Sequence, residues 1–204
     1  PKTRQVAFCR PRTSRRGKGL GELAADADAI LQQYARIDRD TINKLQRCKI
    51  IARYGIGTDI LDLAACREKG IIVTNVPDYC LDEVADHAIS FSFMLMRNLI
   101  HYNKRVHEGS YAWQDWITPI PRYRGASYGM IGFGRIAQNA ARKLCAFGFH
   151  VCAYDPFVSE SLMSSHGVKK ATLEEVLTTS DVVNVFCPYT PQTHHIINAQ
   201  SLDM

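Results

Sequence analysis

The chain has 204 residues, of which 46% are hydrophobic and 22% charged, and its formal net charge is +5 at pH 7. This length and ordinary composition allow one large or two small domains with a buried core and argue against global disorder. The seven cysteines are scattered and form no C-x-x-C pair, so we expect no metal site and predict reduced thiols in a cytoplasmic compartment.

In chain order, the first half alternates apolar and helix-like runs. Strands are predicted at 6–9 and 71–74, apolar runs lie at 29–31 and 49–53, and helix-like runs lie at 20–26, 41–45 and 61–69. The last of these should end at Gly70, because glycine commonly follows a helix. Alternating strands and helices predict parallel α/β layers.

A basic, glycine-containing run interrupts this pattern near the start of the chain. Nucleic acid could contact such a run, but no aromatic platform or reading helix accompanies it, so we favour a solvated loop and expect no nucleic-acid partner. The basic residues are Arg10, Arg12, Arg15, Arg16 and Lys18.

A long helix is predicted after Pro77, with Asp82 and Glu83 in its first turn, where the helix dipole favours acids. We expect it to continue to about residue 108. Its most apolar part, 84–100, carries charged residues, so it should be buried or lie at an interface, and no membrane span is expected.

The second half repeats the alternation. Strands are predicted at 127–131, 149–154 and 182–186, and a helix with one apolar face at 134–147, ended by Gly148. The segment from Thr172 to Glu175 has the pattern of a capping box and should begin another helix.

The stretch GMIGFGRIA, residues 129–137, follows a predicted strand and begins a predicted helix. Gly132 would permit a tight turn, and Gly134 would let the backbone approach a pyrophosphate at the helix N-terminus. Ala137 occupies the third position, where helix and strand pack closely and alanine is accepted. The spacing therefore predicts a dinucleotide site, although a turn that needs glycines for geometry alone is an alternative.

Asp155 stands at the end of the next predicted strand, about 20 residues further on, as in dinucleotide-binding domains. Its carboxylate can accept hydrogen bonds from the adenosine ribose, and its charge would repel a 2′-phosphate. The predicted cofactor is therefore NAD rather than NADP.

Several ordered motifs resemble the D-isomer-specific 2-hydroxyacid dehydrogenases, in the branch of phosphoglycerate dehydrogenase and the C-terminal-binding-protein corepressors. They are RYGIGTDILD at 53–62, GIIVTNVPD at 70–78, EVADH at 83–87, GMIGFGRIA at 129–137, AYDP at 153–156 and VNVFCP at 183–188. The resemblance implies two doubly wound parallel-sheet domains, flavodoxin-like and Rossmann, both incomplete here. We place a substrate-binding domain at 1–99 and an NAD-binding domain at 100–204.

The resemblance also implies site residues. The loop of Tyr54, Gly55 and Ile56 would bind the substrate carboxylate through backbone N–H groups, as glycine-flanked turns can bind anions. For Thr190 and Thr193, ordinary loop polarity is an equal alternative. The implied cofactor-binding residues are Ile56, Val84, Gly132, Gly134, Arg135, Ile136, Asp155, Cys187, Pro188, Thr190 and Thr193.

The family's catalytic arginine, acid and histidine are expected beyond Met204, so we assign no catalytic residue to this chain. His194 and His195 would lie on the adenosine side of the site, and His87 is expected to be a packed helix residue. We interpret the chain as a fragment, or a degenerate product, of a homodimeric NAD-dependent oxidoreductase that acts on small 2-hydroxy or 2-keto acids. A non-catalytic NAD(H)-binding module of the corepressor type is the alternative.

Overall fold

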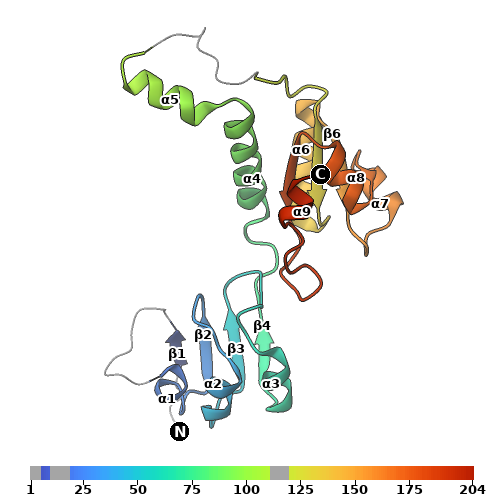
Figure 1. Ribbon diagram of the computed structural model, residues 1–204. Helices are drawn as coiled ribbons and strands as arrows, with labels where there is room; N and C mark the ends of the chain where they lie inside the picture. Colours follow the sequence, from blue (N-terminus) through green and yellow to red (C-terminus); the bar gives the residue numbers. More distant parts are fainter. Residues whose placement is uncertain (1–5, 10–18, 111–119) are drawn as a thin grey trace. The chain divides into compact units, whose positions relative to one another are not determined.

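The computed structural model describes residues 6–9, 19–110 and 120–204 (Figure 1). The basic run at 10–18 lies outside these ranges. The chain divides into two compact units, Pro1–Tyr79 and Cys80–Met204, and each is described by itself.

The first unit is a parallel four-stranded sheet in the order β1-β2-β3-β4. The apolar runs become its inner strands, because alternate residues such as Ile30 and Ile51 are fully buried. The third helix ends before Gly70, which has a left-handed φ of +70°, as predicted. The elements are β1 (Val6–Cys9), α1 (Leu20–Leu23), β2 (Ala29–Gln32), α2 (Arg39–Lys44), β3 (Ile50–Arg53), α3 (Leu63–Glu68) and β4 (Ile72–Thr74).

The second unit has a parallel sheet in the order β7-β6-β5-β8. This is the strand order 3-2-1-4 of a doubly wound fold, in which the order reverses beside the first strand. The predicted α/β fold class is therefore confirmed. The elements are α4 (Leu81–Met96), α5 (Leu99–His107), β5 (Ser127–Ile131), α6 (Arg135–Phe147), β6 (His150–Tyr154), α7 (Glu160–Ser165), β7 (Lys169–Lys170), α8 (Leu173–Thr179), β8 (Val182–Val185) and α9 (Ala199–Leu202).

Helix α4 belongs to the second unit. Its Ala85 and Ile89 lie in the same buried cluster as Ala140 of α6, and the Lys143 ammonium pairs with Asp82 at 2.8 Å. The boundary between the two compact units therefore lies after residue 79. The domain boundary that we predict at residue 99 stays a prediction.

One predicted element differs from the structure. The helix expected to continue to residue 108 is interrupted at Asn98, which has a left-handed φ of 50°, and α5 starts at the next residue. A left-handed residue cannot continue a right-handed helix, so the single predicted helix is wrong and two helices replace it.

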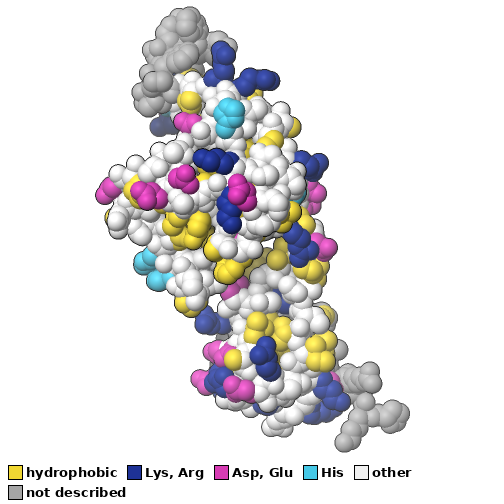
Figure 2. Space-filling view, turned by 90° about the vertical axis from the view of Figure 1, so that its right-hand side faces the viewer, with side chains coloured by type: hydrophobic (Ala, Val, Ile, Leu, Met, Phe, Trp, Pro, Cys, Tyr) yellow, Lys and Arg dark blue, Asp and Glu magenta, His cyan; other side chains and the backbone are white. Residues whose placement is uncertain are grey.

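The surface of the described residues mixes both charges. Figure 2 shows acidic and basic side chains interspersed on the visible face, and exposed ion pairs such as Arg39–Glu68, at 2.6 Å, join them. Among the described residues, none of the helices has the length and apolar character that crossing a membrane requires.

Candidate NAD-binding site

The turn between β5 and α6 brings two distant segments together at Gly132. Its φ of +92° is left-handed, and a Cβ built there would lie 2.6 Å from the backbone N of Cys187. The Cys187 N–H donates to Ile131 O at 2.9 Å, which holds the end of β8 against the turn. The fold therefore requires glycine at 132, both for the backbone conformation and for this close approach.

Gly134 presents the opposite case. Its φ of −73° and ψ of −174° are ordinary extended values, and a Cβ built there would meet no atom within 4 Å. The described chain itself gives no reason for glycine at 134, whereas a ligand that must approach this backbone would require it.

Helix α6 begins directly after Gly134, and no side chain caps its N-terminus. The first backbone N–H groups of a helix have no intrahelical acceptor, and they carry a partial positive charge. Together with the open space at Gly134, this end of α6 fits the pyrophosphate of a dinucleotide.

Asp155 connects the end of β6 to the glycine turn. Its Oδ2 accepts a hydrogen bond from the Phe133 N–H at 2.8 Å, and its Oδ1 accepts one from the Phe157 N–H at 2.9 Å. A carboxylate offers about four acceptor positions, so about two remain for ribose hydroxyls. The sequence predicts the ribose role but not that Asp155 fixes both neighbouring backbone segments.

A cavity of about 410 Å³ lies at this junction, within the usual range for small-ligand sites. Six predicted cofactor residues line it: Gly132, Asp155, Cys187, Pro188, Thr190 and Thr193. Six further lining residues were not predicted: Ile131, Tyr154, Pro156, Phe157, Gln192 and Ile196. Tyr154, Pro156 and Phe157 are the sequence neighbours of Asp155. The position of Asp155 at the end of a predicted strand could therefore have predicted that these neighbours line the site as well.

The loop after β8 is held by its own threonines. The Thr190 N–H donates to Thr193 Oγ1 at 2.8 Å, and that hydroxyl donates to Pro188 O at 2.6 Å. The hydroxyl of Thr193 is thus used within the loop, which supports the alternative of loop polarity, although both threonines also line the cavity. Burial raises the pKa of the Cys187 thiol, with a smaller contribution from the negative charge of Asp155.

Comparison with known proteins identifies the family. Residues 89–204 match the family model described as D-isomer specific 2-hydroxyacid dehydrogenase, NAD binding domain. The chain belongs to this family. The family's cofactor is NAD, in agreement with the cofactor predicted from Gly132, Gly134 and Asp155.

Two curated relatives and one solved structure illustrate the similarity. D-3-phosphoglycerate dehydrogenase of Methanocaldococcus jannaschii is 32% identical over 90% of this chain and 35% of the relative. Hydroxypyruvate reductase of Blautia hydrogenotrophica is 30% identical over 87% of this chain and 56% of the relative. D-lactate dehydrogenase from Aquifex aeolicus, complexed with NAD and lactic acid, aligns with a TM-score of 0.84 and 31% identity over 92% of this chain and 56% of that chain.

The chain spans between about a third and just over half of these dehydrogenases. Not all predicted residues gather at the cavity of its NAD-binding unit. Arg135 and Ile136 lie in the first turn of α6, Val84 is a 40%-exposed residue of α4, and Tyr54, Gly55 and Ile56 belong to the first unit.

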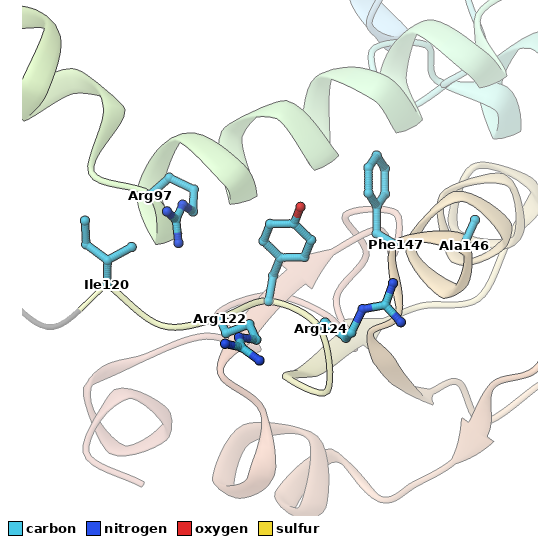
Figure 3. Close-up of a pocket in the computed structure, with 7 residues that line it drawn as sticks. Arg97, Ile120, Arg122, Arg124, Ala146 and Phe147 are labelled. Carbon is cyan, nitrogen blue, oxygen red and sulfur yellow. The ribbon is translucent and has the colours of Figure 1, made fainter.

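A second cavity, of about 830 Å³, lies elsewhere in the NAD-binding unit of this chain (Figure 3). Arg97 comes from the end of α4, Arg122 and Arg124 from the segment before β5, and Phe147 from the end of α6. The Arg97 guanidinium donates to Pro121 O at 3.2 Å. None of the predicted cofactor residues lines this cavity, so it is separate from the nucleotide site.

Proposed function

We propose that the protein to which this chain belongs is an NAD-dependent oxidoreductase that interconverts D-2-hydroxy acids and 2-keto acids. NAD supplies the hydride acceptor in such reactions, and NADH the donor. The observation that carries the proposal is the cavity lined by Gly132 and Asp155. The uncapped N-terminus of α6 follows Gly132 by three residues. In this proposal, Asp155 binds the ribose and the α6 N-terminus binds the pyrophosphate.

The loop from Tyr54 to Gly57 is the proposed substrate-carboxylate site. Its carbonyl groups are already held: Gly55 O accepts from Val76 N–H at 3.2 Å, Ile56 O accepts from Asn75 Nδ2 at 2.8 Å, and Gly57 O accepts from the Arg53 guanidinium. Among the described residues, none accepts from the N–H groups of residues 55–57. Consecutive free N–H groups of this kind favour an anion, which supports binding of a carboxylate.

The proposal gives this chain no proton-transfer residue. His194 Nδ1 lies 2.9 Å from the Tyr189 hydroxyl and, with His195, belongs to the loop whose Pro188 and Thr193 line the nucleotide cavity. That position is on the adenosine side of the proposed cofactor, far along the cofactor from its hydride-transferring ring. His87 of α4 is exposed and makes an edge contact with Phe91, which is itself half exposed, so the expectation of a packed helix residue is wrong.

We also assign a homodimer and a cytoplasmic location. Helix α5 supports the dimer, because none of its nine residues is buried and its Leu99, Ile100 and Val106 are each more than half exposed. A helix this short is marginal without a packing partner. The cytoplasmic location is supported by the described cysteines, which are all free thiols.

The test combines binding and turnover. NADH fluorescence is titrated with the chain, and NADH oxidation is followed with glyoxylate, pyruvate and hydroxypyruvate, using the chain and a version extended to the relatives' length. The proposal expects binding by both and turnover by the extended protein. Binding without turnover of any 2-keto acid by the extended protein would favour the non-catalytic NAD(H)-binding module instead.

A further inference from the structure

The cavity of about 830 Å³ in the NAD-binding unit is lined by three arginines, Arg97, Arg122 and Arg124 (Figure 3). Its volume lies in the usual range for small-ligand sites. None of the described residues that line it is acidic. A cleft lined by charges of one sign concentrates counter-ions, because its low-dielectric walls focus the electric field. The cavity therefore favours an anionic ligand.

The three guanidiniums of the cavity have no carboxylate partner among the described residues. Other exposed arginines of the described chain do have one, such as Arg47, which pairs with Asp28 at 2.9 Å. In the cavity, the Arg97 guanidinium donates to a neutral acceptor, Pro121 O, at 3.2 Å. A guanidinium has five N–H donors, so most donors of the cavity are available to a ligand.

The backbone that carries the arginines is held in place. Tyr123, which stands between the second and third arginine, makes an edge contact with Phe93 of α4, with ring centroids 5.1 Å apart. Phe93 contacts Phe147 in the same way, at 4.9 Å, and the Gly125 N–H donates to Gly148 O at 2.8 Å. These contacts join the end of α6 and the segment before β5 to α4. The guanidiniums thus extend from fixed positions, and a preorganised site loses less conformational entropy when a ligand binds.

We propose that this cavity binds a small ligand with two or more anionic oxygens, either a phosphorylated metabolite or a polycarboxylate. A guanidinium presents a planar fork of N–H donors that matches pairs of phosphate or carboxylate oxygens. Three forks suit a multiply charged ligand better than a single charge. The described residues that line this cavity and the nucleotide cavity are different. The inference therefore goes beyond the proposed function and does not depend on it.

The test titrates the ¹⁵N-labelled chain with inorganic pyrophosphate and with citrate at low ionic strength, both without NADH and with saturating NADH. Nuclear magnetic resonance follows the side-chain Nε–H signals of the arginines. We expect the signals of Arg97, Arg122 and Arg124 to shift whether or not NADH is present. A response to pyrophosphate alone identifies a phosphorylated ligand, and a response to citrate alone identifies a polycarboxylate. Added salt should weaken the binding, because salt screens exposed charges.

Variants test the arginines directly. Arg122→Gln and Arg124→Gln should each weaken anion binding by about tenfold or more, because each removes hydrogen bonds from a charged donor. Arg124→Lys keeps the charge but not the planar fork, so its affinity should lie between those of the unmodified chain and Arg124→Gln. Arg67→Gln is the matched control, because Arg67 is an exposed arginine of α3 in the first unit. It removes the same charge and should leave anion affinity unchanged. Thermal unfolding checks that each variant is folded.

Several results would overturn the inference. The arginine signals could stay unchanged with both anions at millimolar concentrations, or the anion could shift only the amides of 132–136, which would place it at the N-terminus of α6. Equal affinities of the unmodified chain and the Arg→Gln variants would also contradict it. A dimer that Arg122→Gln separates in light scattering, without binding of either anion, would mean that a second copy occupies the cavity. Failure to bind NADH alone would count against the proposed function and leave this inference standing.

Discussion

Asp155 and Phe133 are joined by a hydrogen bond of 2.8 Å from the backbone N–H of Phe133 to Asp155 Oδ2. The bond connects the end of β6 to the turn between β5 and α6, so the acid that is proposed to bind ribose also helps to shape the turn that is proposed to bind pyrophosphate. The two parts of the nucleotide site are therefore one hydrogen-bonded unit.

This arrangement predicts that NADH binds more tightly than NADPH, by about tenfold or more, because juxtaposed like charges cost several kcal/mol. Lys170, which lines a neighbouring cavity together with Asp155, cannot readily compensate for a 2′-phosphate, since its ammonium already donates to Val158 O at 2.7 Å. Fluorescence titration with both cofactors measures the ratio. Equal or tighter binding of NADPH would show that Asp155 does not face the ribose.

The two glycines of the turn should respond differently to substitution. Gly134→Val should lower NADH affinity by about 100-fold or more, because hydrogen bonds to a charged phosphate are lost. Its stability should change by only about 1 kcal/mol, the size of a helix N-cap effect, since the added atoms enter open space.

Gly132→Ala is the matched variant for comparison with Gly134→Val. It should lower the free energy of unfolding by about 2 kcal/mol or more, because alanine is strained in the left-handed backbone and its Cβ would clash with Cys187. Urea unfolding and NADH titration of both variants separate the two effects. A folded Gly134→Val chain with normal NADH affinity would mean that residue 134 is not at a ligand site.

The sequence predicts much of this site because its signals are local. The capping box of Thr172 and Glu175 forms with both of its hydrogen bonds, and Gly148 ends α6 in a left-handed conformation. Such features depend on residues a few positions apart.

Other features depend on contacts that one segment cannot reveal. The strand Lys169–Lys170 has two residues and no apolar pattern, so only its pairing with β6 defines it. The helix break at Asn98 has no proline or glycine to mark it. The contact between Gly132 and Cys187 joins residues more than 50 positions apart.

A buried hydroxyl network between α4 and the sheet should make stability depend on pH. The Tyr128 hydroxyl lies 2.9 Å from Ser92 Oγ, and Asn184 Nδ2 donates to both. Burial raises the pKa of Tyr128 in the folded state, so the unfolded chain loses this proton first. The stabilisation from the protonated Tyr128 hydroxyl is fully present below about pH 10, the ordinary pKa of tyrosine. It is lost as the pH rises through the folded-state pKa.

Tyr128→Phe tests this network. At pH 8 this substitution should lower the free energy of unfolding by about 1 kcal/mol, because the partners of the hydroxyl lose a hydrogen bond. Above pH 10 the difference in unfolding free energy between the variant and the unmodified chain should shrink or reverse. Urea unfolding at both pH values measures it, and a difference that is the same at both would contradict the assignment to Tyr128.

Cysteine labelling should report occupancy of the cavity. The pKa of Cys187 is raised by burial, so its reaction with iodoacetamide should be slow at pH 7 and accelerate as the pH rises above 9, because the thiolate is the nucleophile. Saturating NADH should slow the labelling of Cys187 but not of Cys145, which lies outside the cavity. Mass spectrometry of peptides distinguishes the two sites, and equal labelling of Cys187 with and without NADH would contradict its place beside the cofactor.

The most direct test of the NAD site is nuclear magnetic resonance of the ¹⁵N-labelled chain during titration with NADH, which a 23.0 kDa protein permits. We expect the amide signals of the non-proline residues in 132–136, 155–157 and 187–193 to shift together with one dissociation constant. Unchanged signals in these three segments, or shifts confined to the cavity around Arg97, Arg122 and Arg124, would contradict it.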